Sequence, residues 1–141
     1  MAAPERVSTV GIDTSVVLRL LVGSPPEQAT AALTFVKRCR LTGRRVVVSD
    51  LVISEACFAL HAHYAVPKSE AISALLEMLA SGLVEPADGP LVAEVLERVR
   101  RAPAKPGFLD RLIHAQYSRV PAAMATFERA GKRLPGTTVL R

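Results

Sequence analysis

The chain has 141 residues, enough for one domain with a buried core and too few for two, so we predict a single domain over residues 1–141. Half of its residues are apolar and 22% are charged, and no apolar run reaches the roughly 18 residues of a membrane helix, which excludes an integral membrane protein. The N-terminal MAAPERV lacks the features of a secretory signal, and the widely spaced Cys39 and Cys57 predict reduced thiols in a cytoplasmic protein. The net charge of +5 favours a polyanionic partner.

The first predicted strand runs from Val7 to Ile12 and is followed by a turn and a short helix that ends near Gly23. Asp13 stands at the junction, as the one carboxylate in the otherwise apolar stretch VSTVGIDTSVVLRLL. An unpaired carboxylate is expensive to bury, so this residue either caps the helix or binds a ligand.

The middle of the chain contains three predicted helices and a second strand. Its apolar residues recur at helical spacing except in RRVVVSD, where a short β-branched run is typical of a strand. The predicted elements are a helix after Pro26 that Gly43 ends, a strand at residues 44–50, a helix at 53–64 and a helix at about 68–80.

The last third of the chain continues the alternation. Residues 83–85 are predicted as a short third strand, and Asp88 and Pro90 as the N-cap and first residue of a helix whose apolar stripe extends to Val99. RAPAKPG, residues 101–107, is predicted to be a loop before a helix that begins near Phe108. PAAMATFE and TTVL predict two weak strands near the C-terminus.

Strands separated by helices of ten or more residues predict an α/β fold with a mostly parallel central sheet covered by helices on both faces, in three layers. In such sheets ligands bind beyond the carboxyl ends of the strands. Four acids in apolar contexts meet that description, with Glu55 the most sheltered by its sequence neighbours: Asp13, Glu55, Asp110 and Glu128.

These carboxylates predict a divalent metal site. Clustered carboxylates repel one another and raise some of their pKa values unless a hard cation supplies positive charge. Oxygen ligands suit Mg²⁺ or Mn²⁺, and such an ion activates a water and steadies a phosphate oxygen during in-line displacement. The pattern therefore predicts a metal site that can support in-line displacement at a phosphate.

Four motifs, IDTSVVLRLL, VSDLVISEACFAL, FLDRLIHA and TFERAGKRLPGTTVL, occur in an order and at a spacing that resemble the PIN-domain family, and within it the VapC-type toxins of bacterial and archaeal toxin–antitoxin pairs. The resemblance covers nearly the whole chain. It implies a parallel sheet with helices on both sides, Mg²⁺- or Mn²⁺-dependent ribonuclease activity, a homodimer, and neutralisation by an antitoxin protein.

Position by position, the resemblance makes Asp13, Glu55 and Asp110 the metal-binding acids, and Thr126 the hydroxyl residue of a TFD motif. Glu128 stands where that motif usually has Asp. The substitution keeps the charge but adds a methylene, so we assign Glu128 as an auxiliary catalytic acid that binds the metal only through water or not at all.

Three of the four acids also have a simpler structural interpretation. Asp13 is placed as an N-cap would be, Asp110 as a residue that complements a helix dipole, and Glu128 as an exposed surface charge. Asp50, beside the second strand, is predicted to be the N-cap of the helix that carries Glu55.

Other catalytic constellations fail simple tests. His61 and His63 point to different faces of a predicted helix, and His114 is interpreted as a polar helix position although it follows Asp110 by four residues. No Ser-His-Asp or Cys-His motif is recognisable. AGKR lacks the first Gly and the Ser or Thr of a phosphate loop, and GIDTS lacks the second acid of a two-aspartate phosphatase.

Basic residues beside the proposed acids are candidates to bind RNA phosphates. These are Arg111, Arg129, Lys132 and Arg133. A second basic cluster further away is interpreted as a solvated face, and consists of Arg38, Arg40, Arg44 and Arg45. Aromatic residues make up only 4% of the chain, so recognition is expected to rely on backbone charge and RNA shape more than on extensive stacking.

The sequence thus predicts a metal-dependent endoribonuclease of the PIN and VapC type that hydrolyses RNA with a water bound to Mg²⁺ or Mn²⁺. Two rivals stay open. In one, Glu128 and Gly107, which stands where many relatives carry a further Asp, mark a decayed site that binds RNA or an antitoxin without cutting. In the other, the protein is a PIN nuclease of RNA processing or DNA flap cleavage.

Overall fold

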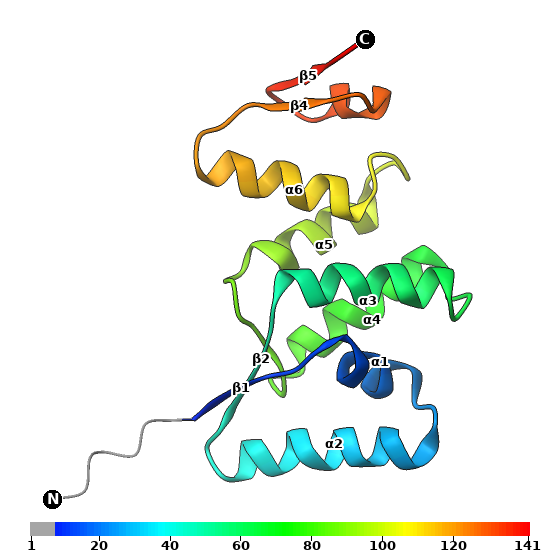
Figure 1. The fold of residues 1–141 in the computed structure, drawn as a ribbon, viewed down its shortest axis with the longest axis vertical. Helices are drawn as coiled ribbons and strands as arrows, with labels where there is room; N and C mark the ends of the chain where they lie inside the picture. Colours follow the sequence, from blue (N-terminus) through cyan, green and yellow to red (C-terminus); the bar gives the residue numbers. More distant parts are fainter. Residues whose placement is uncertain (1–7) are drawn as a thin grey trace, which may run out of the picture. The chain divides into compact units, whose positions relative to one another are not determined.

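The computed structural model describes residues 8–141, and in it the chain divides into two compact units (Figure 1). The first unit ends at Gly89 and the second is Pro90–Arg141. The stretch MAAPERV, which we interpreted as lacking a signal, lies outside the described residues, as does Val7 of the predicted first strand. None of the helices in the described part is long and apolar enough to cross a membrane.

The first unit contains a three-stranded parallel sheet. Its strands follow the order β1-β2-β3, and Val10 of β1 pairs with Val46 of β2. The strands are β1 (Thr9–Gly11), β2 (Arg45–Val48) and β3 (Glu85–Pro86). The mixed α/β class with parallel pairing, predicted from the alternation of strands and helices, is confirmed.

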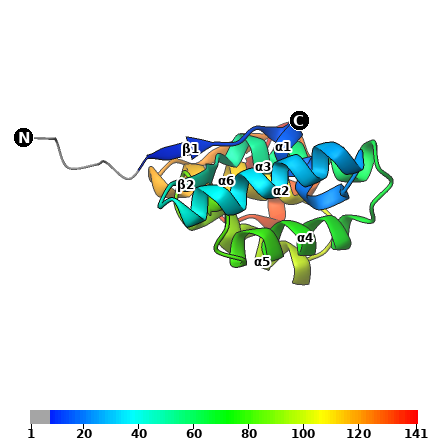
Figure 2. The same cartoon turned by 90° about the horizontal axis from the view of Figure 1, so that it is seen from below.

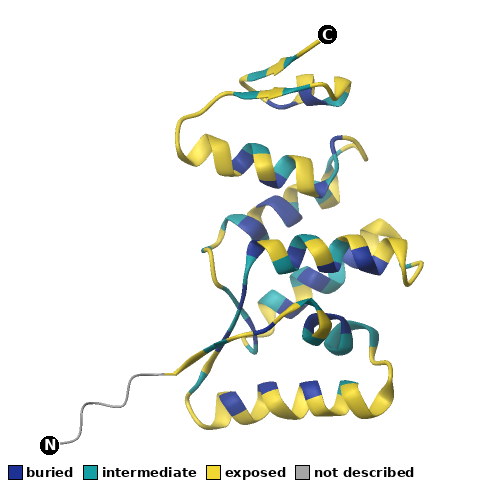
Figure 3. Cartoon of the chain, viewed as in Figure 1, coloured by how far each residue is buried: buried dark blue, intermediate teal, exposed yellow. Residues whose placement is uncertain are grey.

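Four helices complete the first unit: α1 (Thr14–Val22), α2 (Pro26–Leu41), α3 (Asp50–Ala62) and α4 (Lys68–Ala80). Helix α1 packs against α2, α3 and α4, and Figures 1 and 2 show α1 beside α2. The core contains Val17, Val36, Ile53 and Leu75, one from each helix. Buried residues recur along a single face of α2, which is exposed elsewhere (Figure 3).

The start of α3 differs from the prediction in two ways. The helix begins at Asp50, three residues earlier than expected, and its N-cap is Ser49, whose hydroxyl accepts a hydrogen bond from the Val52 N–H at 3.2 Å. The prediction that Asp50 is the N-cap is therefore wrong. Asp50 is instead buried in the first turn, where its own N–H donates to Asp88 Oδ2 at 2.8 Å.

Asp88 consequently does not cap the following helix, contrary to the prediction. It acts on the N-terminus of α3 because β2 and β3 are parallel neighbours, so the segments that leave them meet at one sheet edge. A carboxylate at that place satisfies a free helical N–H and complements the helix dipole. The N-cap of α5 is Pro90, which makes no side-chain capping bond.

The second unit contains two helices, a short 3₁₀ helix and a two-stranded parallel sheet: α5 (Leu91–Arg101), α6 (Phe108–Arg119), β4 (Met124–Thr126), η1 (Arg129–Arg133) and β5 (Thr137–Val139). Helix α5 packs against α6, and Met124 of β4 pairs with Thr137 of β5. Both weak C-terminal strands are thus confirmed. The 3₁₀ helix was not predicted, since five residues of RAGKR carry no apolar periodicity.

Candidate active site

Asp13 joins β1 to α1 and is the N-cap of that helix, with an extended backbone at φ −94° and ψ −179°. Its Oδ1 accepts hydrogen bonds from the Ser15 hydroxyl at 2.6 Å and from the Val16 N–H at 3.2 Å. The bond from Ser15, followed by that from Val16, lowers the pKa of Asp13 from its ordinary value of 3.8. The capping role is therefore confirmed, and both of these bonds are made to Oδ1.

The carboxylate of Asp13 is exposed, although its neighbours Ile12 and Val17 are buried. The expectation of a charge surrounded by apolar side chains is thus wrong. The reason is geometric, because the chain turns at Asp13 from a strand to a helix and the capping side chain points back over the helix end. An exposed carboxylate is accessible to a solvated ion.

We expect the cap to make folding stability depend on pH. Because the pKa of Asp13 is lowered by folding, its contribution is complete above pH 3.8 and is lost as the pH falls below that value. Asp13→Ala should cost about 1 kcal/mol of unfolding free energy at neutral pH. Asp13→Asn should cost little, because Asn is an equally good N-cap.

The measurement is urea unfolding of the wild type and both variants between neutral and acidic pH. Below pH 3.8 the unfolding free energy of the wild type should fall relative to that of Asp13→Asn. An Asp13→Ala protein as stable as the wild type at neutral pH would show that the cap does not hold the helix.

Glu55 lies in the second turn of α3 and is exposed, so the expectation that it is sheltered is wrong. The buried residues of this helix include Ile53, Ala56 and Leu60, which follow one face. Glu55 is two positions from Ile53 and therefore points away from that face. Its apolar sequence neighbours are not its spatial neighbours.

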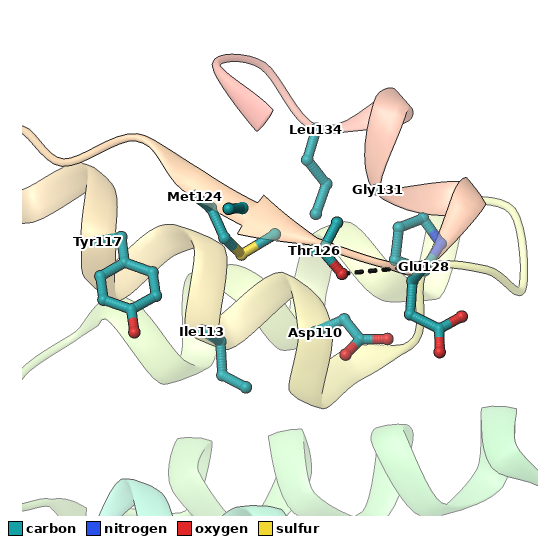
Figure 4. Close-up of a pocket in the computed structure, with 10 residues that line it drawn as sticks. Asp110, Ile113, Tyr117, Met124, Thr126, Glu128, Gly131 and Leu134 are labelled. Atoms are coloured by element: carbon teal, nitrogen blue, oxygen red, sulfur yellow. Dashed lines mark hydrogen bonds between the residues drawn. The ribbon is translucent and has the colours of Figure 1, made fainter. Parts of the chain in front are cut away.

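A pocket of about 240 Å³ in the second unit brings together three of the predicted site residues, Asp110, Thr126 and Glu128. Asp110 is in the first turn of α6, Thr126 ends β4, and Glu128 precedes η1. Figure 4 shows the carboxylates of Asp110 and Glu128 projecting on the same side of the pocket. The rest of the wall includes Ile113, Tyr117, Met124 and Leu134.

Thr126 positions the chain that carries Glu128. Its Oγ1 accepts a hydrogen bond from the Glu128 N–H at 3.0 Å, which fixes the turn after β4 (Figure 4). Its methyl group faces Gly131, where an added Cβ would lie 2.6 Å from Thr126 Cγ2 and 3.4 Å from Thr137 Cγ2. The η1 backbone therefore packs against Thr126 at a distance that only glycine allows.

Gly131→Ala should destabilise the second unit by about 1–3 kcal/mol, because the new methyl overlaps a β-branched side chain that has few rotamers. Gly136→Ala is a poor control because that residue has a positive φ, whereas Gly107→Ala adds a methyl with nothing within 4 Å. Chemical unfolding followed by circular dichroism compares Gly131→Ala with Gly107→Ala. Equal stability of the two variants would contradict the close packing at Gly131.

The four basic residues predicted to bind phosphate divide into two pairs. Arg111 Nε donates to the Pro106 carbonyl at 2.8 Å, and Arg133 Nη1 donates to the Lys105 carbonyl, so these two hold the loop before α6. Arg129 and Lys132 are exposed on η1. The latter pair are the better candidates for binding an anionic substrate.

His114 also has a structural partner. Its Nε2 donates to the Pro135 carbonyl at 2.7 Å, which joins α6 to the segment before β5. This agrees with its interpretation as a polar helix position.

Both cysteines are free. Burial raises the pKa of the Cys57 thiol above its ordinary value, and the nearby Lys68 offsets part of that increase.

The predicted metal-binding acids are distributed over the two units. Asp13 and Glu55 are in the first unit, and Asp110 and Glu128 are in the second. Over the described residues, 8–141, no group of three His, Cys, Asp or Glu side chains lies close enough to hold a metal ion. The pocket in the second unit brings together Asp110 and Glu128, two of the four predicted acids.

The comparisons with known proteins identify the family. No curated protein matches the chain. Residues 10–135 match the PIN domain, a stretch that includes Asp13 between β1 and α1, α3 with Glu55, α6 with Asp110, and β4 with Thr126. A match over this much of the sequence shows that the chain belongs to the PIN domain family.

Proposed function

We propose that the protein is a metal-dependent endoribonuclease in which Asp13, Glu55 and Asp110 bind Mg²⁺ or Mn²⁺ and Glu128 assists. PIN domains are generally nucleases and generally use divalent metal ions. The observation that carries the proposal is the pocket in which Asp110, Thr126 and Glu128 converge at the carboxyl end of β4, in a chain of this family.

The donor set suits a hard divalent ion. All the candidate ligands are carboxylates, and oxygen ligands favour Mg²⁺ and Mn²⁺ over softer metals. The lowered pKa of Asp13 keeps its carboxylate ionised at neutral pH, as metal binding requires. When bound, such an ion supplies Lewis-acid chemistry that lowers the pKa of a water and offsets charge on the phosphate.

The side chains of the protein supply position and charge. Ser15 and the Val16 N–H hold Asp13 in one orientation, and Thr126 holds the backbone of Glu128. Arg129 and Lys132 on η1 are exposed one and four residues after Glu128, and we expect them to bind phosphates that flank the cleaved bond. Long, exposed cations of this kind bind the backbone without reading the base sequence.

The test is calorimetric titration of Mn²⁺ into the wild type, Asp110→Asn and Glu128→Gln. We expect the affinity to fall at least about tenfold in Asp110→Asn, and less in Glu128→Gln because the longer acid assists from a distance. Glu94→Gln removes an exposed acid of α5 that is outside the pocket and is the matched control. Absence of Mn²⁺ binding by the wild type would contradict the proposal and favour a scaffold that binds RNA or a protein without cutting.

Within this function we propose the role of a VapC-type toxin that forms a homodimer and is neutralised by an antitoxin. The motif order and spacing described above support this assignment. Expression should arrest growth, a small partner protein should relieve the arrest, and the purified protein should sediment as a dimer. Ribonuclease activity without growth arrest would instead support a PIN nuclease of RNA processing.

A further inference from the structure

A groove between α1 and α2 in the first unit is separate from the pocket at Asp110. It has a volume of about 320 Å³, which is within the range of small-ligand sites. It is lined by Ser15, Val16, Arg19, Gln28, Ala31, Ala32 and Phe35. Ser15, Val16 and Arg19 belong to the motif IDTSVVLRLL, whereas the groove residues of α2 belong to none of the four motifs.

The groove is connected directly to Asp13. Ser15 lines it, and the Ser15 hydroxyl donates to Asp13 Oδ1 at 2.6 Å. A ligand at the Ser15 end of the groove would therefore lie near the carboxylate that we propose to bind metal. For a nuclease, this is where a nucleotide next to the cleaved phosphate would be placed.

The apolar part of the groove suits a flat aromatic ligand. Phe35 exposes 37% of its surface although it is a large apolar residue, and the small Ala31 and Ala32 leave room beside it. Unpaired RNA bases are recognised by stacking on such aromatic side chains. The Arg44 guanidinium lies 6.0 Å from the centre of the Phe35 ring and adds positive charge next to the groove.

The polar part of the groove offers hydrogen-bond donors. Arg19 Nε donates to Gln28 Oε1 at 2.6 Å, and the Gln28 NH₂ group and the other N–H groups of Arg19 are donors that this hydrogen bond does not use. A base edge that matches this arrangement carries adjacent acceptors. Guanine does so with O6 and N7, which arginine commonly binds as a pair.

The charge around the groove favours a nucleic acid over a protein helix. Arg38 is exposed and follows Phe35 by three residues, so it continues the same face of α2. Arg19 lines the groove and Arg44 lies over the Phe35 ring, so three cations belong to this part of a chain of net charge +5. Backbone phosphates on either side of a bound base would be attracted to these side chains.

We infer that this groove binds an unpaired guanine of single-stranded RNA, adjacent to the phosphate that is cleaved. The inference rests on the proposed function, because it places the base next to Asp13. Phe35 stacks on the base, Gln28 and Arg19 donate to its O6 and N7, and Arg38 and Arg44 hold the backbone.

The test is fluorescence anisotropy with labelled oligouridine that carries one central guanine, adenine or cytosine. Binding is measured in EDTA with the full-length wild type and the Phe35→Ala and Gln28→Ala variants, so no cleavage contributes. We expect the guanine oligomer to bind most tightly, Phe35→Ala to weaken its binding about tenfold or more, and Gln28→Ala to remove the preference. Leu33→Ala is the matched control, because Leu33 is a similarly exposed apolar residue of α2, at 40%, and does not line the groove.

Two outcomes would overturn the inference. One is equal binding of all three oligomers by the wild type. The other is unchanged RNA affinity in Phe35→Ala, which would leave the groove as a surface for a protein partner. A preference for guanine in EDTA without Mn²⁺-dependent cleavage would support base binding in the groove and contradict the proposed function. Cleavage that Phe35→Ala does not change would support the proposed function and contradict base binding in the groove.

Discussion

Replacing Asp13 with Asn is expected to weaken Mn²⁺ binding and to reduce RNA cleavage at least about a hundredfold, while the protein stays as stable as the wild type. Stability is kept because Asn accepts the same capping hydrogen bond that Asp13 accepts from Val16. Activity is lost because the substitution removes the negative charge that attracts the cation. The two properties of this residue are thus separable by a change of one functional group.

The measurement combines metal titration, cleavage of a labelled RNA and thermal unfolding on the same preparations. Glu27→Gln, in the first turn of α2, is the control because it neutralises another exposed acid near a helix N-terminus. Full cleavage by Asp13→Asn would show that Asp13 acts only as a cap. A parallel fall in melting temperature would assign the loss to folding and contradict the separation of the two properties.

Truncating Ile53 to Ala should cost about 2–5 kcal/mol of unfolding free energy, the largest stability effect that we predict. Ile53 is fully buried, at 0% exposure, on the face of α3 that also buries Ala56 and Leu60. The truncation leaves a cavity in the core of the first unit, and the same helix presents Glu55 on its exposed face. Loss of helix order should therefore reduce metal affinity as well.

Leu51→Ala is the matched control for this truncation. Leu51 is in the same helix but is 82% exposed, so its loss should change stability by no more than about 0.5 kcal/mol. Both variants are compared by urea unfolding. The unfolding is followed by circular dichroism because the chain has no Trp whose fluorescence could report it. Equal costs would contradict the orientation of α3 and with it the exposure of Glu55.

Glu128 shows how a departure from the family pattern is accommodated locally. The Thr126 hydroxyl accepts a hydrogen bond from the Glu128 N–H. Because the donor is the backbone, this bond does not depend on the side chain at position 128. Glu128 also lines the same pocket as Asp110, so its longer side chain still offers a carboxylate there. This geometry supports an assisting role in the proposed site.

Helix boundaries were predictable where a single residue decides them. Asp13 begins α1 because its side chain accepts from a free helical N–H, and Gly23 ends the helix because it adopts φ 73°, which is costly for residues with a Cβ. Helix α4, predicted at about residues 68–80, is observed at Lys68–Ala80. These interactions span a few residues and are therefore encoded in the local sequence.

The sequence by itself determined the mixed α/β class and the parallel pairing, because apolar periodicity, capping residues and motif spacing are local or ordered along the chain. The residues of the candidate site remain a prediction from the same motifs. Only the tertiary structure decided that Asp88 serves the start of α3, 38 residues away from Asp50, and that Gly131 packs on Thr126. It also decided that Glu55 is exposed, since sequence neighbours on a helix point to different sides. Contacts between distant segments depend on how strands pair and which helix face is buried, and a linear pattern does not contain that information.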